Sequence, residues 1–156
     1  FPYAMKLLKE NDLNESILEF AKTGKPILGI CLGMQLLFEE SSENGLSLGL
    51  NLLKGKVDRF KLTKGFSIPQ IQWNMLIKKN DCTLMAGIPD KEYFYYVNSY
   101  CIDSLSLEKN YKMYVSKYAN QVFLGLIEHE NIMGVQFHPE KSAKTGLLLM
   151  KNFIGK

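Results

Sequence analysis

The sequence has few of the residues that build disulfide frameworks and metal sites. It has three cysteines, Cys31, Cys82 and Cys101, and two histidines, His129 and His138. The odd number of cysteines and the lack of a Cys-x-x-Cys pair argue against a disulfide framework. No cysteine lies at ligand spacing from a histidine, so we expect no metal site. Free cysteines are typical of a reducing compartment, which predicts a cytoplasmic protein.

The chain also lacks long apolar runs and a strong charge of one sign. No run approaches the roughly 18 apolar residues that a membrane span requires, so we expect no membrane partner. The 19 basic and 16 acidic residues give a net charge of +3, and the basic residues are scattered. A scattered basic set does not predict nucleic-acid binding. The phosphate-binding motifs GxxxxGK[ST] and GxGxxG are absent, which argues against the nucleotide-binding proteins built on them.

The residues that are present indicate one domain, covering residues 1–156. The chain is 46% hydrophobic, which is enough for a sizeable core. Amphipathic patterns predict helices over residues 3–10 and over 14–22, with Asn14 as the N-cap of the second. The apolar run 27–30 predicts a buried strand, followed by a helix over 32–40 and a loop over 41–49.

The second half of the chain is rich in strand patterns. Alternating or β-rich segments predict strands at 56–60, 67–72, 93–99, 112–117, 122–128 and 132–137. Ser142 is expected to cap a final amphipathic helix over 143–153. Helical elements followed by a strand-rich half predict an α/β domain with a mixed sheet flanked by helices.

The segment around Cys31 is typical of a strand, a sharp turn and a helix. Cys31 stands between Gly29 and Gly33, directly behind the apolar strand pattern. This is the cysteine version of a nucleophile elbow, in which glycines leave room for a tight turn. A cysteine at the start of a helix is expected to gain thiolate character from the free N–H groups and the helix dipole.

A base and a carboxylate occur far downstream, in the segment His138-Pro139-Glu140. In extended backbone residues i and i+2 face the same side, so Glu140 is expected to accept from one imidazole nitrogen. The other nitrogen is then free to act as a base toward Cys31. The N–H of Leu32 is the natural first oxyanion donor, and Gln35 lies one helical turn beyond the cysteine.

Each of these residues also has a simpler interpretation. A cysteine between glycines is more often a small buried residue, and a lone histidine is more often structural. Their occurrence together favours catalysis. Cys82 and Cys101 lack glycine neighbours and are predicted to be packing residues. Trp73 and the aromatic cluster 93–96 belong by default to the core or to strands, with a contact surface at a sheet edge as the alternative.

Longer segments carry a resemblance to a known family. Residues 25–37 (KPILGICLGMQLL) and 134–142 (GVQFHPEKS) resemble the two catalytic motifs of class I glutamine amidotransferases. Lys-Val at 56–57, Gln-Trp-Asn at 72–74 and Tyr-Phe-Tyr at 93–95 resemble the glutaminase subunits of imidazole glycerol phosphate synthase. The resemblance covers essentially the whole chain. It implies a flavodoxin-like fold and a Cys31–His138–Glu140 triad that hydrolyses L-glutamine to glutamate and ammonia.

The resemblance also implies a binding site and a partner. The residues that it implies for holding glutamine are Gln35, Leu32, Ser99 and Tyr100. Ammonia is expected to pass to a barrel-shaped cyclase subunit, in a heterodimer of histidine biosynthesis. The interface positions implied are Trp73, Asn74, Tyr95 and Lys141. No metal or organic cofactor is implied.

Three departures from the family pattern leave alternatives open. The family's first strands and helix, with a Pro-Gly-x-Gly oxyanion loop, are expected to precede Phe1. Gln70 and Gln72 stand in a segment that is usually Pro-His-Met-Gly, and Asn98 replaces a histidine. We expect these changes on the partner-facing side. They keep open a paralogous ammonia-donating subunit for surface-polysaccharide sugars, and the expected missing segment keeps open a truncated, non-catalytic interaction domain.

Overall fold

The computed structural model describes residues 1–61 and 63–156. The first elements are α1 (Pro2–Glu10), α2 (Leu13–Lys22), β1 (Ile27–Ile30) and α3 (Leu32–Leu36). The strands that follow are β2 (Phe38–Ser41), β3 (Ser47–Leu48), β4 (Leu53–Arg59), β5 (Gln70–Lys78), β6 (Glu92–Asn98), β7 (Tyr100–Ile102), β8 (Lys112–Tyr118), β9 (Gln121–His129) and β10 (Ile132–Val135). Short 3₁₀ turns lie at η1 (Thr83–Met85), η2 (Ser104–Ser106) and η3 (Pro139–Lys141), and α4 (Ala143–Ile154) follows them.

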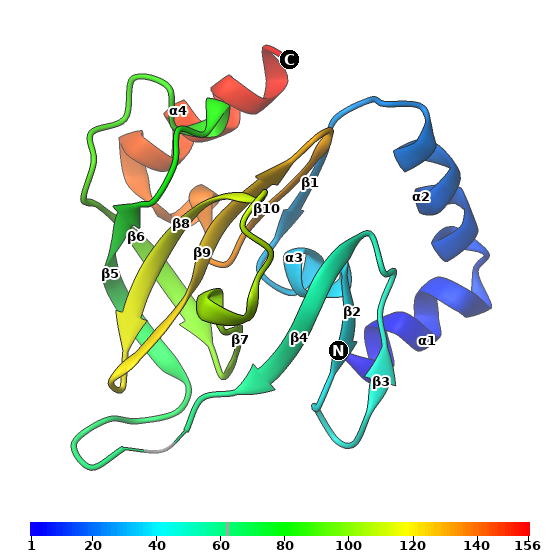
Figure 1. Cartoon of the computed structure of the whole chain (residues 1–156), viewed down its shortest axis with the longest axis horizontal. Coiled ribbons are helices and arrows are strands. Elements are labelled where there is room, and N and C mark those ends of the chain that lie inside the picture. Colours follow the sequence, from blue (N-terminus) through cyan, green and yellow to red (C-terminus); the bar gives the residue numbers. More distant parts are fainter. Residues whose placement is uncertain (62) are drawn as a thin grey trace.

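The strands form two mixed sheets. The 6-stranded sheet has the order β1-β10-β9-β8-β5-β6, in which β1 is parallel to β10 and the other neighbours are antiparallel. The 4-stranded sheet has the order β3-β2-β4-β7, with β2 and β4 parallel. Figure 1 shows α4 on one side of the strands and α1 and α2 on the other. The predicted α/β fold with a mixed sheet flanked by helices is confirmed.

Both faces of strand β9 are buried, and each packs against a different hydrophobic cluster. Phe123 and Leu126 belong to the cluster that includes Leu149 of α4. Leu124 and Ile127 belong to the second cluster, which includes Met34 of α3 and residues of α1 and α2. Apolar residues in succession along β9 therefore join the two halves of the core. Among residues 1–61 and 63–156, no helix has the length and apolar character to cross a membrane.

Several predicted boundaries are wrong, and tertiary pairing explains them. The helix expected over 32–40 ends at Leu36, and Phe38 starts β2 instead, fully buried and opposite Leu53 of β4. An apolar run fits a helix or a buried strand equally well, so the neighbouring strand decides. Strand β3 lies within the segment that was expected to be a loop. Strand β5 covers residues 70–78 instead of the expected 67–72. The N-cap of α2 is Asp12 and not Asn14.

Helix α3 packs directly on the backbone of β1 and β10. Gly29 and Gly134 are register partners on these strands. A Cβ atom on Gly29 would lie 2.7 Å from the backbone of Gly33 and Met34. A Cβ atom on Gly134 would lie 2.4 Å from Cγ of Met34. The two glycines thus form a bare surface on which the helix rests, and this contact places the preceding turn.

The substitution Gly29→Ala tests this contact. The new methyl group meets backbone atoms that have no side-chain freedom to move aside, so we expect a loss of about 1–3 kcal/mol in the free energy of unfolding. Gly33→Ala is the matched control, because a Cβ there meets nothing within 4 Å. Chemical denaturation of both variants gives the measurement. Equal stability of the Gly29 variant and the parent protein would contradict the packing described.

Candidate active site

Cys31 occupies the turn between β1 and α3 in a backbone conformation that is rare for a side-chain-bearing residue. Its φ is 50° and its ψ is −107°. Strain of this kind costs on the order of 1–3 kcal/mol and persists only where surrounding contacts impose it. The Cys31 N–H donates to Val135 O at 2.7 Å, and its carbonyl accepts from Gln35 N at 3.2 Å. The structure therefore has the strand–turn–helix elbow that the glycine pattern indicates.

The Cys31 sulfur is partly buried and hydrogen-bonded on two sides. Its S–H donates to the Val97 carbonyl at 3.7 Å, and Gln136 Nε2 donates to the sulfur at 3.7 Å. Burial raises the pKa of the Cys31 thiol, and the N–H of Leu32 and the Gln136 amide offset this only in part. The expected gain in thiolate character is opposed by burial of the sulfur. Helix α3 is five residues long, and desolvation outweighs its N-terminal N–H groups.

His138 and Glu140 form a pair on the turn after β10. Nδ1 of His138 lies 2.7 Å from Oε1 of Glu140. The segment is a 3₁₀ turn rather than the extended chain assumed from the sequence. His138 N–H donates to Tyr95 O at 2.9 Å, while Ser142 Oγ donates to His138 O at 2.7 Å and accepts from Tyr95 N at 3.0 Å. Ser142 makes no side-chain cap on α4; it ties this turn to β6 instead.

The thiol and the His–Glu pair come from adjacent parallel strands. Ile30 and Val135 are register partners, so the residues that follow them leave the same edge of the sheet. The Glu140 carboxylate contributes to the raised pKa of the Cys31 thiol, which agrees with this arrangement. Among the hydrogen bonds of the described residues, those of the Cys31 sulfur go to Val97 and Gln136 and not to His138. Catalytic hydrogen bonds often form only when substrate is bound.

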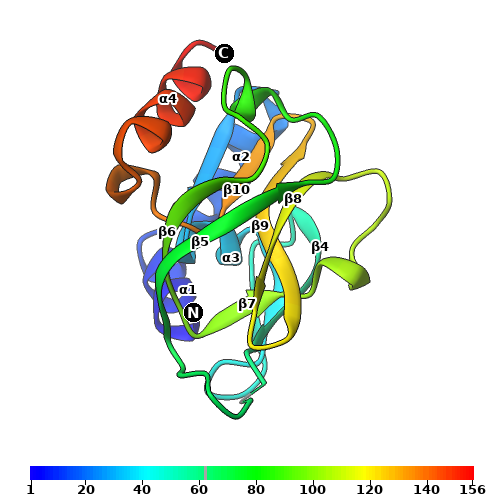
Figure 2. The same ribbon diagram turned by 90° about the vertical axis from the view of Figure 1, so that its left-hand side faces the viewer.

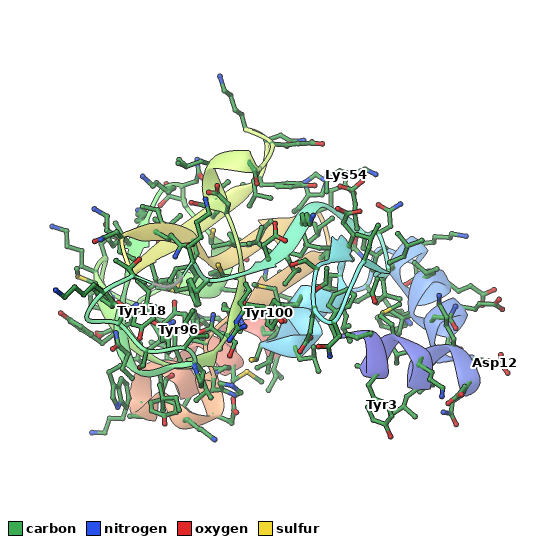
Figure 3. The ribbon with its side chains drawn as sticks, turned by 90° about the horizontal axis from the view of Figure 1, so that it is seen from below. Tyr3, Asp12, Lys54, Tyr96, Tyr100 and Tyr118 are labelled. Carbon is green, nitrogen blue, oxygen red and sulfur yellow. The ribbon has the colours of Figure 1, made fainter. Side chains whose placement is uncertain are left out.

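Three of the residues expected to hold substrate, Leu32, Gln35 and Tyr100, lie on or contact the elbow and α3. Leu32 is exposed beside Cys31. Gln35 is buried, and its Nε2 donates to Tyr100 O at 3.1 Å and to Gln136 Oε1 at 2.9 Å. Tyr100, labelled in Figure 3, is half-buried and is linked to α3 by this hydrogen bond. Ser99 lies between β6 and β7, and its carbonyl accepts from Phe60 N at 3.0 Å.

Sequence reasoning missed Gln136 as a site residue. It is 0% exposed, yet its amide contacts both the sulfur of Cys31 and the side chain of Gln35. The sequence did contain a signal for it: Gln136 lies two residues before His138, in a segment expected to be a strand, so the two side chains could have been expected on the same side. The internal contact of the Gln35 side chain was also not expected, because the resemblance implies that Gln35 holds glutamine.

The four expected interface residues do not all share one surface. Trp73 and Tyr95 are cross-strand partners with ring centroids 6.1 Å apart, and Lys141 Nζ lies 6.0 Å from the Tyr95 ring. Figure 2 looks onto the β5–β6 hairpin that carries the two aromatic residues. Asn74 instead donates to Gln70 Oε1 at 2.8 Å and to Lys117 O at 2.9 Å.

Two departures from the family pattern are also placed differently from expectation. Gln70 is fully buried and Asn98 nearly so. They are register partners, and Gln70 Nε2 donates to Asn98 Oδ1 at 2.8 Å. The expectation that these changes face a partner is therefore wrong for Gln70 and Asn98. Gln72 is exposed on the same strand.

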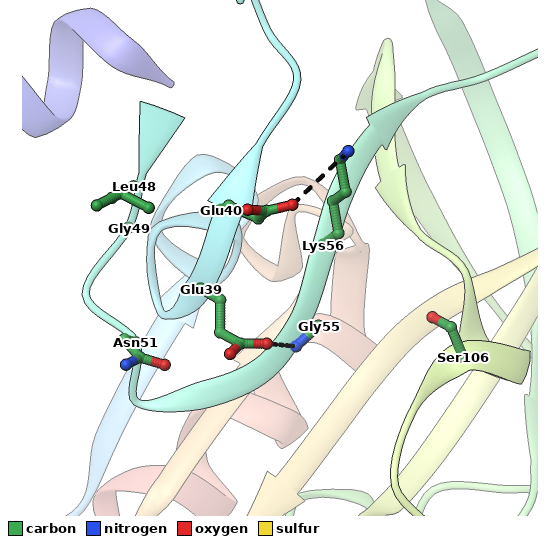
Figure 4. A pocket seen from close by; sticks show the side chains of 8 residues that line it. All are labelled: Glu39, Glu40, Leu48, Gly49, Asn51, Gly55, Lys56 and Ser106. Carbon is green, nitrogen blue, oxygen red and sulfur yellow. Dashed lines mark hydrogen bonds and ion pairs between the residues drawn. The ribbon is translucent and has the colours of Figure 1, made fainter. Parts of the chain in front are cut away.

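A separate pocket of about 580 Å³ lies beside β2 and β4 (Figure 4). Its lining residues are Glu39, Glu40, Leu48, Gly49, Asn51, Gly55, Lys56 and Ser106. Glu39 accepts from Gly55 N at 2.8 Å, which together with Lys54 lowers the pKa of its carboxyl group. Glu40 pairs with Lys56 at 3.6 Å. The pocket lining contains no cysteine or histidine, so the nucleophile candidate remains at the elbow.

A cysteine at a strained strand–helix turn, at the same sheet edge as a histidine that a carboxylate orients, is the arrangement of a cysteine-dependent acyl-transfer enzyme. The family model "Glutamine amidotransferase class-I" matches residues 9–156. The "Imidazole glycerol phosphate synthase subunit HisH" of Desulfitobacterium hafniense is 44% identical over 153 residues, covering 98% of this chain and 70% of that protein. The protein of the same name from Wolinella succinogenes is 42% identical over 156 residues, covering 98% and 75%.

Solved structures agree on the fold. A crystal structure of a glutamine amidotransferase matches with a TM-score of 0.69 and 15% identity, over 97% of this chain and 71% of that one. A glutamine amidotransferase from Thermotoga maritima matches with a TM-score of 0.58 and 26% identity, over 96% and 52%. The chain belongs to the class-I glutamine amidotransferase family and, within it, to the HisH subunits of imidazole glycerol phosphate synthase.

Proposed function

We propose that this chain hydrolyses the side-chain amide of L-glutamine to glutamate and ammonia, as the glutaminase subunit of imidazole glycerol phosphate synthase in histidine biosynthesis. The observation that carries the proposal is Cys31 at the strained turn, at the same sheet edge as the His138–Glu140 pair. Membership in the HisH family supports the choice of substrate and pathway.

The proposed reaction begins with proton transfer from the Cys31 thiol to Nε2 of His138, because Nδ1 faces Glu140. The sulfur attacks the amide carbon, and the N–H of Leu32 stabilises the negative oxygen that forms. Nitrogen leaves as ammonia with the proton that His138 carries. Water then hydrolyses the glutamyl thioester, with His138 again accepting a proton. Glu140 holds the imidazole ring and its positive charge.

The resting thiol fits this order of events. Burial raises the pKa of the Cys31 thiol, so the proposed reaction needs a base that takes the proton from the sulfur. In the proposed reaction the thiolate forms when His138 accepts that proton. In the proposed site, Leu32, Gln35, Ser99 and Tyr100 line the space for glutamine. Leu32 is exposed, Ser99 and Tyr100 are half-buried, and Gln35 is buried with its Nε2 on the Tyr100 carbonyl.

We further propose that ammonia passes to a barrel-shaped cyclase subunit that docks on the β5–β6 face in the cytoplasm. This face is defined by the exposed Ile71, Trp73 and Tyr93, with Tyr95 and Lys141 beside them. Large aromatic residues on an exposed strand pair are typical of protein interfaces. Tyr95 joins the face to the site, since its carbonyl accepts from His138 N and its N–H donates to Ser142.

The variant Cys31→Ala tests the proposed reaction. We expect glutamate release by the full-length protein with its cyclase partner to fall by a factor on the order of 10⁴ or more, because the nucleophile is lost. Cys101→Ala is the control: Cys101 is buried, and burial raises the pKa of its thiol to about 12. The control is expected to keep its activity. Undiminished glutamate release by the Cys31 variant would overturn the proposal.

Growth of a histidine auxotroph that lacks this subunit distinguishes the histidine-pathway acceptor of ammonia from a polysaccharide sugar. The parent gene is expected to restore growth and the Cys31 variant is not. A protein that releases glutamate but never restores growth would favour the polysaccharide alternative. A parent protein without turnover would favour a non-catalytic interaction domain.

The variant Trp73→Ala tests the docking face. Trp73 is 48% exposed at the centre of the β5–β6 face, so its loss is expected to weaken cyclase binding by about 2 kcal/mol. This corresponds to a roughly 30-fold rise in Kd, measured by titration calorimetry. Tyr3→Ala is the control, since Tyr3 is 70% exposed on α1, away from this face. Equal Kd values for the two variants would place the interface elsewhere.

A further inference from the structure

Gln136 is a fully buried amide with a polar partner at each end. Its Oε1 accepts from Gln35 Nε2 at 2.9 Å, and its Nε2 donates to the Cys31 sulfur at 3.7 Å. Burial of an amide is unfavourable unless its polar atoms are hydrogen-bonded. Both partners of Gln136 belong to the turn and helix that carry the nucleophile. The amide is therefore part of the site.

The orientation of the Gln136 amide is fixed by Gln35. The Nε2 group of Gln35 has two N–H bonds, and it donates to Tyr100 O and to Gln136 Oε1. Because Gln136 Oε1 receives one of them, the nitrogen end of its amide faces the sulfur. A flipped Gln136 would place two N–H groups against each other. The hydrogen bonds that link Tyr100, Gln35, Gln136 and Cys31 therefore allow one orientation of the Gln136 amide.

We propose that Gln136 is a catalytic residue of the reaction proposed above: its Nε2–H holds the sulfur of Cys31 and stabilises the thiolate, and Gln35 is the positioning residue that keeps that N–H toward the sulfur. The inference rests on the proposed function and deepens it. It also gives Gln35 a different role from the one the resemblance implies, because its amide nitrogen donates to Tyr100 O and Gln136 Oε1 and not to glutamine.

The need for this donor follows from the surroundings of the sulfur. The Val97 carbonyl oxygen accepts a hydrogen bond from the S–H of the thiol, but it would repel a negatively charged thiolate. Burial and the nearby Glu140 charge also disfavour the anion. The N–H groups of Leu32 and Gln136 act in the opposite direction. A hydrogen bond to an ionised acceptor is about twice as strong as one to a neutral acceptor, so the Gln136 contact gains strength as the thiolate forms.

Alkylation of Cys31 by iodoacetamide across a range of pH, followed by mass spectrometry, measures thiolate formation directly. Burial raises the pKa of Cys82 and of Cys101 to about 12, so the profile below that pH reports Cys31. The parent profile is expected to rise above the ordinary thiol range. Gln136→Met keeps the size of the side chain and removes the donor. It is expected to alkylate about tenfold more slowly at pH 8.

Two further variants separate this role from simple packing. Gln35→Met is expected to slow alkylation in the same direction but less, because Gln136 keeps its N–H and loses only its orientation. Gln70→Met is the matched control: Gln70 is also a fully buried amide, hydrogen-bonded to Asn98 and Asn74, and it does not contact the sulfur. It is expected to leave the profile unchanged. Gln136→Glu, which is closer in shape, serves if thermal denaturation shows that the Met variant does not fold.

A Gln136 variant that folds and keeps the parent profile would overturn the inference. An equal shift in the Gln70 variant would also overturn it, since that result would report general loosening. The assay contains no glutamine, so its outcome is independent of the proposed reaction. A shifted profile in a protein that never releases glutamate would contradict the proposed function and leave the thiolate contact standing.

Discussion

The packing of α3 on two facing glycines sets the geometry of this site. Gly29 and Gly134 leave the backbone of β1 and β10 bare, and Met34 fills the space that side chains would occupy. A helix that starts this close to its strand requires an abrupt turn, and the turn falls on Cys31 at a φ of 50°. The strain is offset by backbone hydrogen bonds to Val135 and Gln35 on either side of the cysteine. The same turn presents the sulfur at the edge where His138 emerges.

Burial gives the site its second property, a thiol whose pKa is raised. The elbow places the sulfur between the Val97 carbonyl and the Gln136 amide, in a position where desolvation raises its pKa. The proposed chemistry then depends on a base that accepts the thiol proton. The imidazole of His138, with Nδ1 at 2.7 Å from Oε1 of Glu140, supplies that base. The buried amides behind the cysteine contribute the donor that an isolated sulfur in this position would lack.

The sequence predicted those features that rest on local patterns. The strand over residues 27–30 and the elbow follow from apolar residues and glycines at fixed spacing, and the His–Glu pair follows from two neighbouring positions. Features that depend on strand register were out of reach. Leu36, Leu37 and Phe38 suit either a helix or a strand, and pairing with β4 decides. The Gln70–Asn98 pair and the Gln35–Gln136 contact join residues 28 and 101 positions apart, so no local pattern reports them.

Mass spectrometry of the acid-quenched enzyme during turnover, with glutamine and the cyclase partner present, tests the central claim most directly. The claim is that the strained turn makes Cys31 the nucleophile. The account predicts a glutamyl thioester on the peptide that carries Cys31, and none on the peptides that carry Cys82 or Cys101. Rapid ammonia release with no adduct at Cys31, or with the adduct on another residue, would contradict it.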